Sequence, residues 1–170
     1  MYEKGEYVVY GQNGICQVQD ITEMQMPGAE HSRTYYVLIP ETNNGNTIYI
    51  PVDNERLVIR RVLSKAEAER LREELIGLEP LQISGEKARE PEYKAALRSC
   101  DCRQWAQLIK TLYLRKQERV AQGKKMTSTD ERYLKQTEDC LYQELAMVLG
   151  MDKKELQEEI AAQMMDMITA

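Results

Sequence analysis

Four cysteines and one histidine are the residues of this chain whose chemistry is most versatile. The cysteines are Cys16, Cys100, Cys102 and Cys140. Their spacing differs from the two C-x2-C pairs of a structural zinc site, so we predict reduced thiols in or near a core. Metal binding or redox chemistry is the alternative. His31 lies in a predicted loop, where a single histidine is more often solvated than catalytic.

The sequence motifs of catalysis and nucleotide binding are absent. The chain contains no G-x-G-x-x-G, no G-x-x-x-x-G-K, no H-E-x-x-H and no nucleophile elbow. Gly11 and Gly14 fall in a turn between predicted strands, where no helix N-terminus follows to bind a phosphate. We therefore predict a protein that is not an enzyme, with no metal, cofactor or small-molecule substrate. An uncharacterised enzyme stays as an alternative, which a deep pocket lined by ionisable groups would favour.

Charge is distributed unevenly along the chain. Residues 86–135 carry thirteen basic and seven acidic side chains, a net charge of +6, although the whole chain has a net charge of −5. The flanking segments are acidic, at −3 for residues 1–62, −2 for residues 63–85 and −6 for residues 136–170. Such a protein is not expected to coat nucleic acid, but its basic segment could face a phosphate backbone that is held nearby.

The basic side chains of that segment are the candidate DNA contacts. They are Arg89, Lys94, Arg98, Arg115, Lys116, Arg119, Arg132 and Lys135, with Lys124 and Lys125 as further bases. Each one that neutralises a phosphate adds a salt-dependent increment to binding. For any single residue, a solvated and ion-paired helix face is the simpler interpretation. The excess of the whole group over its acidic flanks favours a phosphate-facing surface.

Residues 1–62 predict a small antiparallel β-barrel or a strongly bent sheet. Five short apolar stretches rich in β-branched residues are separated by turns, such as the one between Gly11 and Gly14. The segment "ETNNGN" predicts another turn. Pro40 and Pro51 are expected at strand ends, because proline cannot donate a ladder hydrogen bond.

The remainder of the chain predicts helices. Ser64 and Glu67 form a capping box for a linking helix that runs to about Leu78, and a linker follows it. From Glu90 onward four helices are expected. Their signals are Pro91 in a first turn, Asp101 as an N-cap, Ser128 with Glu131 as a capping box, Gly150 as a stop, and Asp152 before a helix at 153–168. The predicted class is α+β, with a β-domain at 1–62, a linking helix and linker at 63–85, and a helical domain at 86–170.

Both halves resemble the CarD-like family of bacterial transcription regulators. The segments "KGEYVVYGQNGICQVQDI", "YYVLIP" and "TIYIPVDN" resemble the RNA-polymerase-interacting domain that this family shares with the transcription-repair coupling factor. The segments "YKAALRSCDCRQWAQLIKTLYLRKQERVAQG" and "DERYLKQTEDCLYQELAMVLG" resemble the helical domain of the family. The resemblance covers about residues 1–150 and includes both domains in the same order.

The resemblance implies a fold and a division of labour. A Tudor-like β-domain would dock on the β-subunit lobe of RNA polymerase, partly by pairing at a strand edge. The helical domain would contact promoter DNA weakly and without sequence specificity, and would modulate the stability of the open complex. The alternative is a polymerase-binding adaptor, or a competitor of the repair coupling factor, that has no direct DNA contact.

The sequence departs from the family pattern at the DNA-facing position. Family members place a tryptophan wedge four residues before the tyrosine of "Y-K-x-x-L", and this chain has Arg89 there. Arg89 could enter a minor groove or pair with a phosphate, but it cannot unstack bases as an indole does. The only tryptophan, Trp105, has Ile109 and Leu112 as its i+4 and i+7 neighbours, so we predict that it is core.

The predicted polymerase-binding residues are Tyr49, Met24, Ile48 and Ile50. Met24 and Tyr49 align with arginines that some family members use for docking, so this surface is expected to be more apolar or matched to a different polymerase lobe. Strand alternation places Ile48 and Ile50 on one face and Tyr49 on the other, so Tyr49 is exposed if the isoleucines are core. The chain has no apolar run of about eighteen residues. It also lacks the apolar stretch of a secretory signal, so we expect a cytoplasmic protein, associated with the nucleoid through polymerase.

Overall fold

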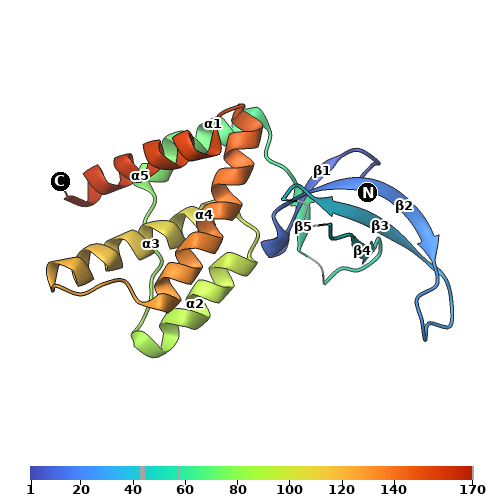
Figure 1. Cartoon of the computed structure of the whole chain (residues 1–170), viewed down its shortest axis with the longest axis horizontal. Helices are drawn as coiled ribbons and strands as arrows, with labels where there is room; N and C mark the ends of the chain where they lie inside the picture. Colours follow the sequence, from blue (N-terminus) through green and yellow to red (C-terminus); the bar gives the residue numbers. More distant parts are fainter. Residues whose placement is uncertain (43–44, 57, 170) are drawn as a thin grey trace. The chain divides into compact units, whose positions relative to one another are not determined.

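The N-terminal part of the chain forms one antiparallel sheet of five strands (Figure 1). The structure is a computed structural model that describes residues 1–42, 45–56 and 58–169. The strands are β1 (Tyr7–Tyr10), β2 (Ile15–Met24), β3 (Arg33–Pro40), β4 (Ile48–Pro51) and β5 (Ile59–Arg61), in the order β4-β3-β2-β1-β5. The chain divides into two compact units, Met1–Val62 and Leu63–Ala170, which are described separately below.

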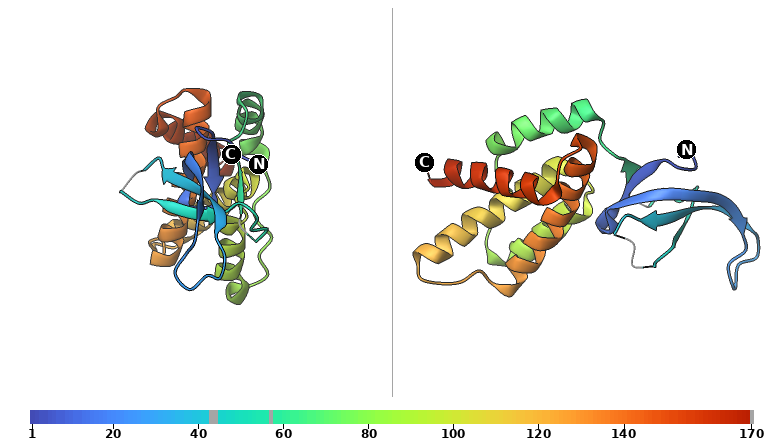
Figure 2. Two further views of the ribbon diagram at one scale, coloured as in Figure 1. Left: turned by 90° about the vertical axis from the view of Figure 1, so that its right-hand side faces the viewer. Right: turned by 45° about the horizontal axis from the view of Figure 1, so that its top comes forward.

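The sheet is open in the part of the chain that the structure describes. β4 pairs with β3 and β5 pairs with β1, so β4 and β5 are the two edges. A closed Tudor-like barrel is therefore not confirmed, whereas the alternative of a strongly bent sheet fits. β2 and β3 curve together along their length, and the register between them shifts at Val18 and Asp20 (Figure 2). A bulge of this kind increases the local bend and twist of a sheet.

One face of the sheet forms the core of the first unit. This core consists of Val8, Cys16, Val18, Tyr36, Leu38 and Ile50. Gly11 and Gly14 have positive φ angles of 49° and 70° around a 3-10 turn, which confirms the predicted β1–β2 turn. Pro40 and Pro51 are the last residues of their strands, as predicted. Two residues of the turn predicted in "ETNNGN", at 43–44, lie outside the described residues.

The second unit contains five α-helices. They are α1 (Lys65–Glu74), α2 (Glu86–Arg98), α3 (Cys102–Ala121), α4 (Ser128–Leu149) and α5 (Lys153–Thr169), and a 3-10 turn, η2 (Leu75–Gly77), extends α1. α3 packs against α2, α4 and α5, and α4 also contacts α1 and α2 (Figure 2). Trp105, Tyr93 and Tyr142 are fully buried at the centre of this bundle. No described helix is both long and apolar enough to cross a lipid bilayer.

Local capping explains where most helices begin. The Ser64 side chain accepts from the Glu67 N–H and the Glu67 carboxylate accepts from the Ser64 N–H, which confirms the first capping box. Asp101 caps α3, and Gly150 ends α4 in the left-handed conformation, as predicted. The second capping-box prediction was one residue off. Thr127 is the N-cap of α4, and its hydroxyl accepts from the Asp130 N–H.

The start of α2 differs from the sequence prediction, whereas the end of the linking helix agrees with it. α2 begins at Glu86, so Pro91 lies inside the helix instead of in its first turn. α1 changes to a 3-10 turn at Leu75 that ends at Gly77, which agrees with the linking helix predicted to about Leu78. Residues 78–85 lie in no helix or strand, so a linker is found where the sequence predicted one.

Candidate functional site

The free edge of β4 is the candidate docking surface in the first unit. Tyr49 pairs with Val37 of β3, and its side chain is 46% exposed. Ile50, at 2% exposure, belongs to the core, and Ile48 is half-buried. The predicted alternation is confirmed. The side chain of Ile50 is therefore not available to a partner, although its main chain lies on the edge strand.

Met24 lies apart from this edge. It is the last residue of β2, is half-buried and pairs with Arg33 of β3. Tyr49 pairs with Val37, four residues further along β3. A strand advances about 3.3 Å per residue, so the two pairing positions are about 13 Å apart along the sheet. Met24 and Tyr49 therefore do not form one contact cluster.

In the second unit, Arg115 is held between two carboxylates. Its Nε lies 2.8 Å from Oδ2 of the buried Asp130, and its Nη1 donates to Glu86 at 2.8 Å. The hydrogen bond to Glu86 raises the pKa of the Arg115 guanidinium, and the same bond lowers the pKa of Glu86. Only 18% of the Arg115 side chain is exposed. Arg115 is thus an internal ion-pair partner between α2, α3 and the start of α4.

Arg89, which the sequence resemblance aligned with a tryptophan wedge, folds back onto its own helix. Its Nε lies 3.2 Å from Glu86 Oε1, and its Nη1 donates to the Tyr93 hydroxyl at 3.2 Å. Burial raises the pKa of that tyrosine. Arg132 and Lys94 share Glu90, at 3.4 Å and 3.9 Å. We call Glu86, Arg89, Glu90, Arg115, Asp130 and Arg132 the ion-pair cluster.

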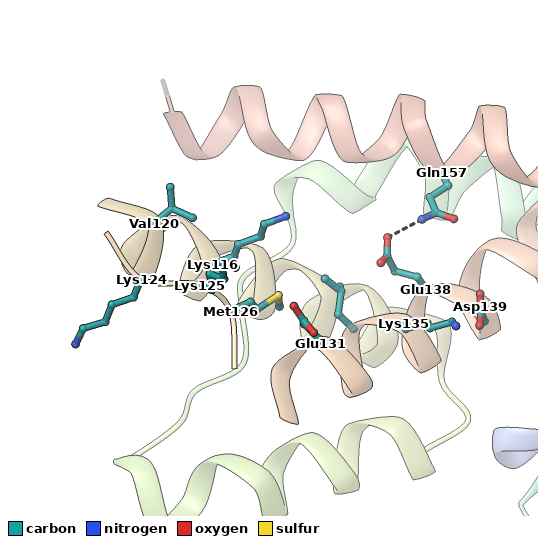
Figure 3. Close-up of a pocket in the computed structure, with 11 residues that line it drawn as sticks. Lys116, Val120, Lys124, Lys125, Met126, Glu131, Lys135, Glu138, Asp139 and Gln157 are labelled. Carbon is teal, nitrogen blue, oxygen red and sulfur yellow. Dashed lines mark hydrogen bonds between the residues drawn. The ribbon is translucent and has the colours of Figure 1, made fainter. Parts of the chain in front are cut away.

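A different group of bases surrounds a hollow of about 450 Å³ (Figure 3). Its lysines are Lys116 on α3, Lys124 and Lys125 in the α3–α4 segment, and Lys135 on α4. All four are exposed, and none has an ion pair within residues 1–42, 45–56 and 58–169. Its apolar lining comes from Val120, Met126 and Leu134. We call this feature the lysine hollow.

The acidic residues at the lysine hollow are mostly occupied by other partners. Glu138 accepts a hydrogen bond from the Gln157 amide at 3.1 Å (Figure 3). It also accepts one from the Tyr113 hydroxyl at 2.8 Å. Burial raises the pKa of Glu138. Asp139 pairs with Lys153 at 3.0 Å. The four lysines outnumber the three carboxylates of the lining, Glu131, Glu138 and Asp139, so the hollow keeps a small excess of positive charge.

Five of the eight predicted DNA contacts lie in these two environments, and Lys94 pairs with Glu90 beside the ion-pair cluster. Arg89, Arg115 and Arg132 lie in the ion-pair cluster, whereas Lys116 and Lys135 lie at the hollow. Arg98 is exposed, with no ion pair among the described residues, and Arg119 donates to the carbonyl of Lys125 at 2.7 Å. Sequence reasoning missed the apolar lining of the hollow. The available signal was Val120, an apolar residue at the polar end of α3.

The four cysteines lie inside the two units. All four cysteines are buried and unbridged, as the sequence predicted. In the part of the chain that is described, no group of three or more His, Cys, Asp or Glu residues is arranged to hold a metal ion. Burial raises the pKa of Cys16 to about 11 and that of Cys140 to about 12, which disfavours their reactive thiolate forms.

Comparison with known families gives one match for each unit. Residues 2–63 match a family model described as the CarD-like/TRCF RID domain. Residues 82–161 match a family model described as the CarD C-terminal domain. Together the two matches cover most of the sheet and most of the helical bundle. A search of curated proteins returned no match.

Proposed function

This chain belongs to the CarD-like family, and from that premise we propose that it is a bacterial regulator that docks on the β-subunit lobe of RNA polymerase and contacts promoter DNA without sequence specificity. Its domains are those of proteins that interact with RNA polymerase in transcription regulation. Through these two contacts the protein modulates the stability of the open complex. The observation that carries the docking half is the free edge of β4 with the exposed Tyr49.

An edge strand supports docking because its outer main-chain groups can continue a ladder into a partner sheet. Side chains on the exposed face then add specificity, and Tyr49 is the large apolar side chain in that position. β5 forms the other edge, and the exposed Val58 lies just before it. Val58 is 46% exposed, as is Tyr49, so it provides a matched control.

The test is a pull-down of purified β-subunit lobe by wild type, Tyr49→Asp and Val58→Asp. We expect Tyr49→Asp to weaken binding by about tenfold or more, which corresponds to about 1.4 kcal/mol. Val58→Asp should bind as the wild type does. If both variants bind as the wild type does, or if Val58→Asp alone loses binding, the β4 edge is not the docking surface.

The exposed bases support the DNA contact. Polymerase docking would raise the local concentration of DNA near the helical unit, so that weak phosphate contacts suffice. Lys116, Lys135 and Arg98 are better placed for phosphates than Arg89 and Arg115, whose charges are balanced internally. Free protein should bind any duplex weakly, with a steep salt dependence. Tight, sequence-specific binding by the free protein would overturn this mechanism.

The DNA contact is tested by measuring duplex binding as a function of salt. Each lost phosphate contact lowers the slope of log K against log salt by about 0.9. Lys116→Gln/Lys135→Gln should therefore lower the slope by about 2, and Lys154→Gln, an exposed lysine on α5, should leave it unchanged. An unchanged slope in the double variant would remove these lysines from the DNA contact.

An adaptor without DNA contact is the second candidate. It is favoured by the internal pairing of Arg89 and Arg115 and by the arginine at the wedge position. Charge reversal at Lys94, Arg98 and Lys116 distinguishes the two functions, since these side chains are exposed. If the lifetime of the promoter complex is unchanged in vitro, the adaptor is correct. Without a wedge, the effect on open-complex lifetime is expected to be small or opposite in sign.

A further inference from the structure

We propose that the lysine hollow binds a small amphipathic anion, with an apolar or aromatic body and a carboxylate or phosphate head. The hollow measures about 450 Å³, and ligand sites in proteins are typically about 300–1,000 Å³. It lies entirely within the helical unit, between α3, α4 and α5. Such a ligand would be bound and not converted.

The apolar lining accounts for the body of the ligand. Val120 is 55% exposed at the end of α3, and Met126 is half-buried in the α3–α4 segment. Leu134 on α4 also lines the hollow, with only 9% of its surface exposed. Apolar side chains that meet water in a concave site gain free energy when a ligand covers them. A phosphate group alone has no apolar surface that could cover this lining.

The lysine rim accounts for the head of the ligand. Lys116, Lys124, Lys125 and Lys135 line the hollow from α3, the α3–α4 segment and α4, and the Lys124 side chain points away from the other lining residues (Figure 3). None of the four has an ion pair within the described residues. Three carboxylates line the same hollow, Glu131, Glu138 and Asp139. Asp139 pairs with Lys153, and the charge of Lys116 acts on Glu138, so the four lysines keep a small excess of positive charge. A site with an excess of cations attracts an anion.

Gln157 fixes the inner wall of the site. Its amide reaches from α5 to Glu138 on α4 at 3.1 Å (Figure 3). Tyr113 on α3 donates to the same carboxylate at 2.8 Å. Three helices are thus joined by one hydrogen-bonded group behind the hollow. The wall is therefore formed before a ligand arrives, and a preformed wall lowers the ordering cost of binding.

The experiment uses the full chain and isothermal titration with two probes. One is dodecanoate, below its micellar concentration, and the other is magnesium-free ATP. Dodecanol and adenosine are their neutral analogues. The two arms distinguish an alkyl carboxylate from a nucleoside polyphosphate as the source of the anion. We expect at least one probe to bind in the micromolar to submillimolar range, and its neutral analogue to bind about tenfold more weakly.

Two variants test the location. Lys116→Gln/Lys135→Gln removes rim charge, and Val120→Thr/Met126→Gln makes the lining polar with little change of shape. Each double variant should lower the affinity for the probe by about tenfold, while Lys154→Gln should bind the probe as the wild type does. All of these positions are exposed or half-buried, and urea unfolding of each variant confirms that the fold is retained.

Three results would overturn the proposal. One is that neither probe binds more tightly than its neutral analogue up to millimolar concentration. Another is binding that both double variants leave unchanged, because the site would then lie elsewhere. The third is a loss of duplex DNA affinity in Val120→Thr/Met126→Gln that equals its loss of probe affinity, which would make the lining part of the DNA contact. The polymerase pull-down is independent of all three, so failure here would leave the docking function untouched.

Discussion

Arg115 of α3 and Asp130 of α4 face each other with 2.8 Å between Nε and Oδ2, and the Asp130 side chain is only 3% exposed. A carboxylate this deeply buried is stable as an ion only while a cation remains beside it. Sequence patterns grouped Arg115 with the DNA contacts, because its type and neighbours are those of a basic surface. Its environment instead gives it a role in stability.

Removal of Arg115 should therefore destabilise the fold more than it affects DNA. Arg115→Met leaves Asp130 buried without its partner, and we expect a loss of about 3 kcal/mol in the free energy of unfolding. Urea unfolding followed by circular dichroism measures this change. The double variant Arg115→Met/Asp130→Leu should recover much of the loss, because no buried charge is left.

Lys116→Met is the control for that prediction. Lys116 is the next residue on α3 and is exposed, so its replacement should change stability by no more than about 0.5 kcal/mol. Equal stability of Arg115→Met and Lys116→Met would mean that the ion pair with Asp130 contributes little, and would return Arg115 to the set of DNA contacts.

Trp105 gives a spectroscopic test of the missing wedge. It is the only tryptophan, it is fully buried, and its Nε1–H donates to the carbonyl of Leu97 at 3.0 Å. Its fluorescence should have the blue-shifted maximum of a buried indole and should not change when forked DNA is added. Quenching or a shift on addition of DNA would show that the indole reaches the nucleic acid.

Glu138 should make stability depend on pH. Burial raises its pKa above the ordinary 4.5, although Tyr113 and Gln157 oppose the shift by donating to the carboxylate. The folded protein thus binds this proton more tightly than the unfolded chain does. The contribution of Glu138 is fully present below pH 4.5 and is lost as the pH rises through the raised value. Urea unfolding of wild type and Glu138→Gln between pH 4 and pH 7 measures the effect. On acidification, the free energy of unfolding of the wild type should rise relative to that of Glu138→Gln. If the wild type instead gains stability over the variant as the pH rises, the pKa of Glu138 is not raised in the folded protein.

The thiols should react slowly in the folded protein. All four cysteines are buried, and a rise in pKa from 9.0 to about 12 lowers the thiolate fraction of Cys140 about a thousandfold. Titration with an aromatic disulfide reagent at pH 8 should therefore show four thiols promptly in denaturant and a much slower reaction without it. A prompt native reaction of any cysteine would indicate a redox-accessible site and would revive the alternative left open by the sequence.

Glu144 should be needed for stability as a hydrogen-bond acceptor. Its side chain is fully buried and accepts from the Leu63 N–H at 2.9 Å and from the Cys102 thiol at 3.3 Å. Glu144→Leu removes both acceptors and should cost about 1–3 kcal/mol in the free energy of unfolding. Glu144→Gln, which keeps an acceptor oxygen of similar reach, should cost less. Equal losses in the two variants would assign the effect to charge instead of to the hydrogen bond.

Local signals in the sequence predicted most of the elements. Ser64, Asp101 and Gly150 act through hydrogen bonds and backbone angles within a few residues, so their effects can be read from adjacent letters. The start of α4 was displaced by one residue because Thr127 and Ser128 are both good N-caps, and only the geometry selects Thr127. Closure of the sheet depends on pairing between distant strands, which no local pattern encodes.

The candidate site was predictable in composition but not in arrangement. The sequence shows that bases are concentrated in one segment, yet Arg115 and Lys116 are adjacent and have opposite environments. The difference depends on Glu86 and Asp130, which α2 and α4 bring to one side of α3. Likewise, Val120 and Met126 meet Leu134 only because the chain turns back between α3 and α4.

The length of β4 also limits how the protein can associate with itself. The strand has only four residues and ends in Pro51, which has no N–H to donate. In an antiparallel ladder alternate residues direct their main-chain groups to the same side, so about half of this short strand faces outward. Two copies joined edge to edge would share too few hydrogen bonds to persist, which protects against aggregation. Because β4 offers so few main-chain hydrogen bonds, a partner that binds stably must also contact its side chains. Side-chain contacts therefore decide which partner this edge binds.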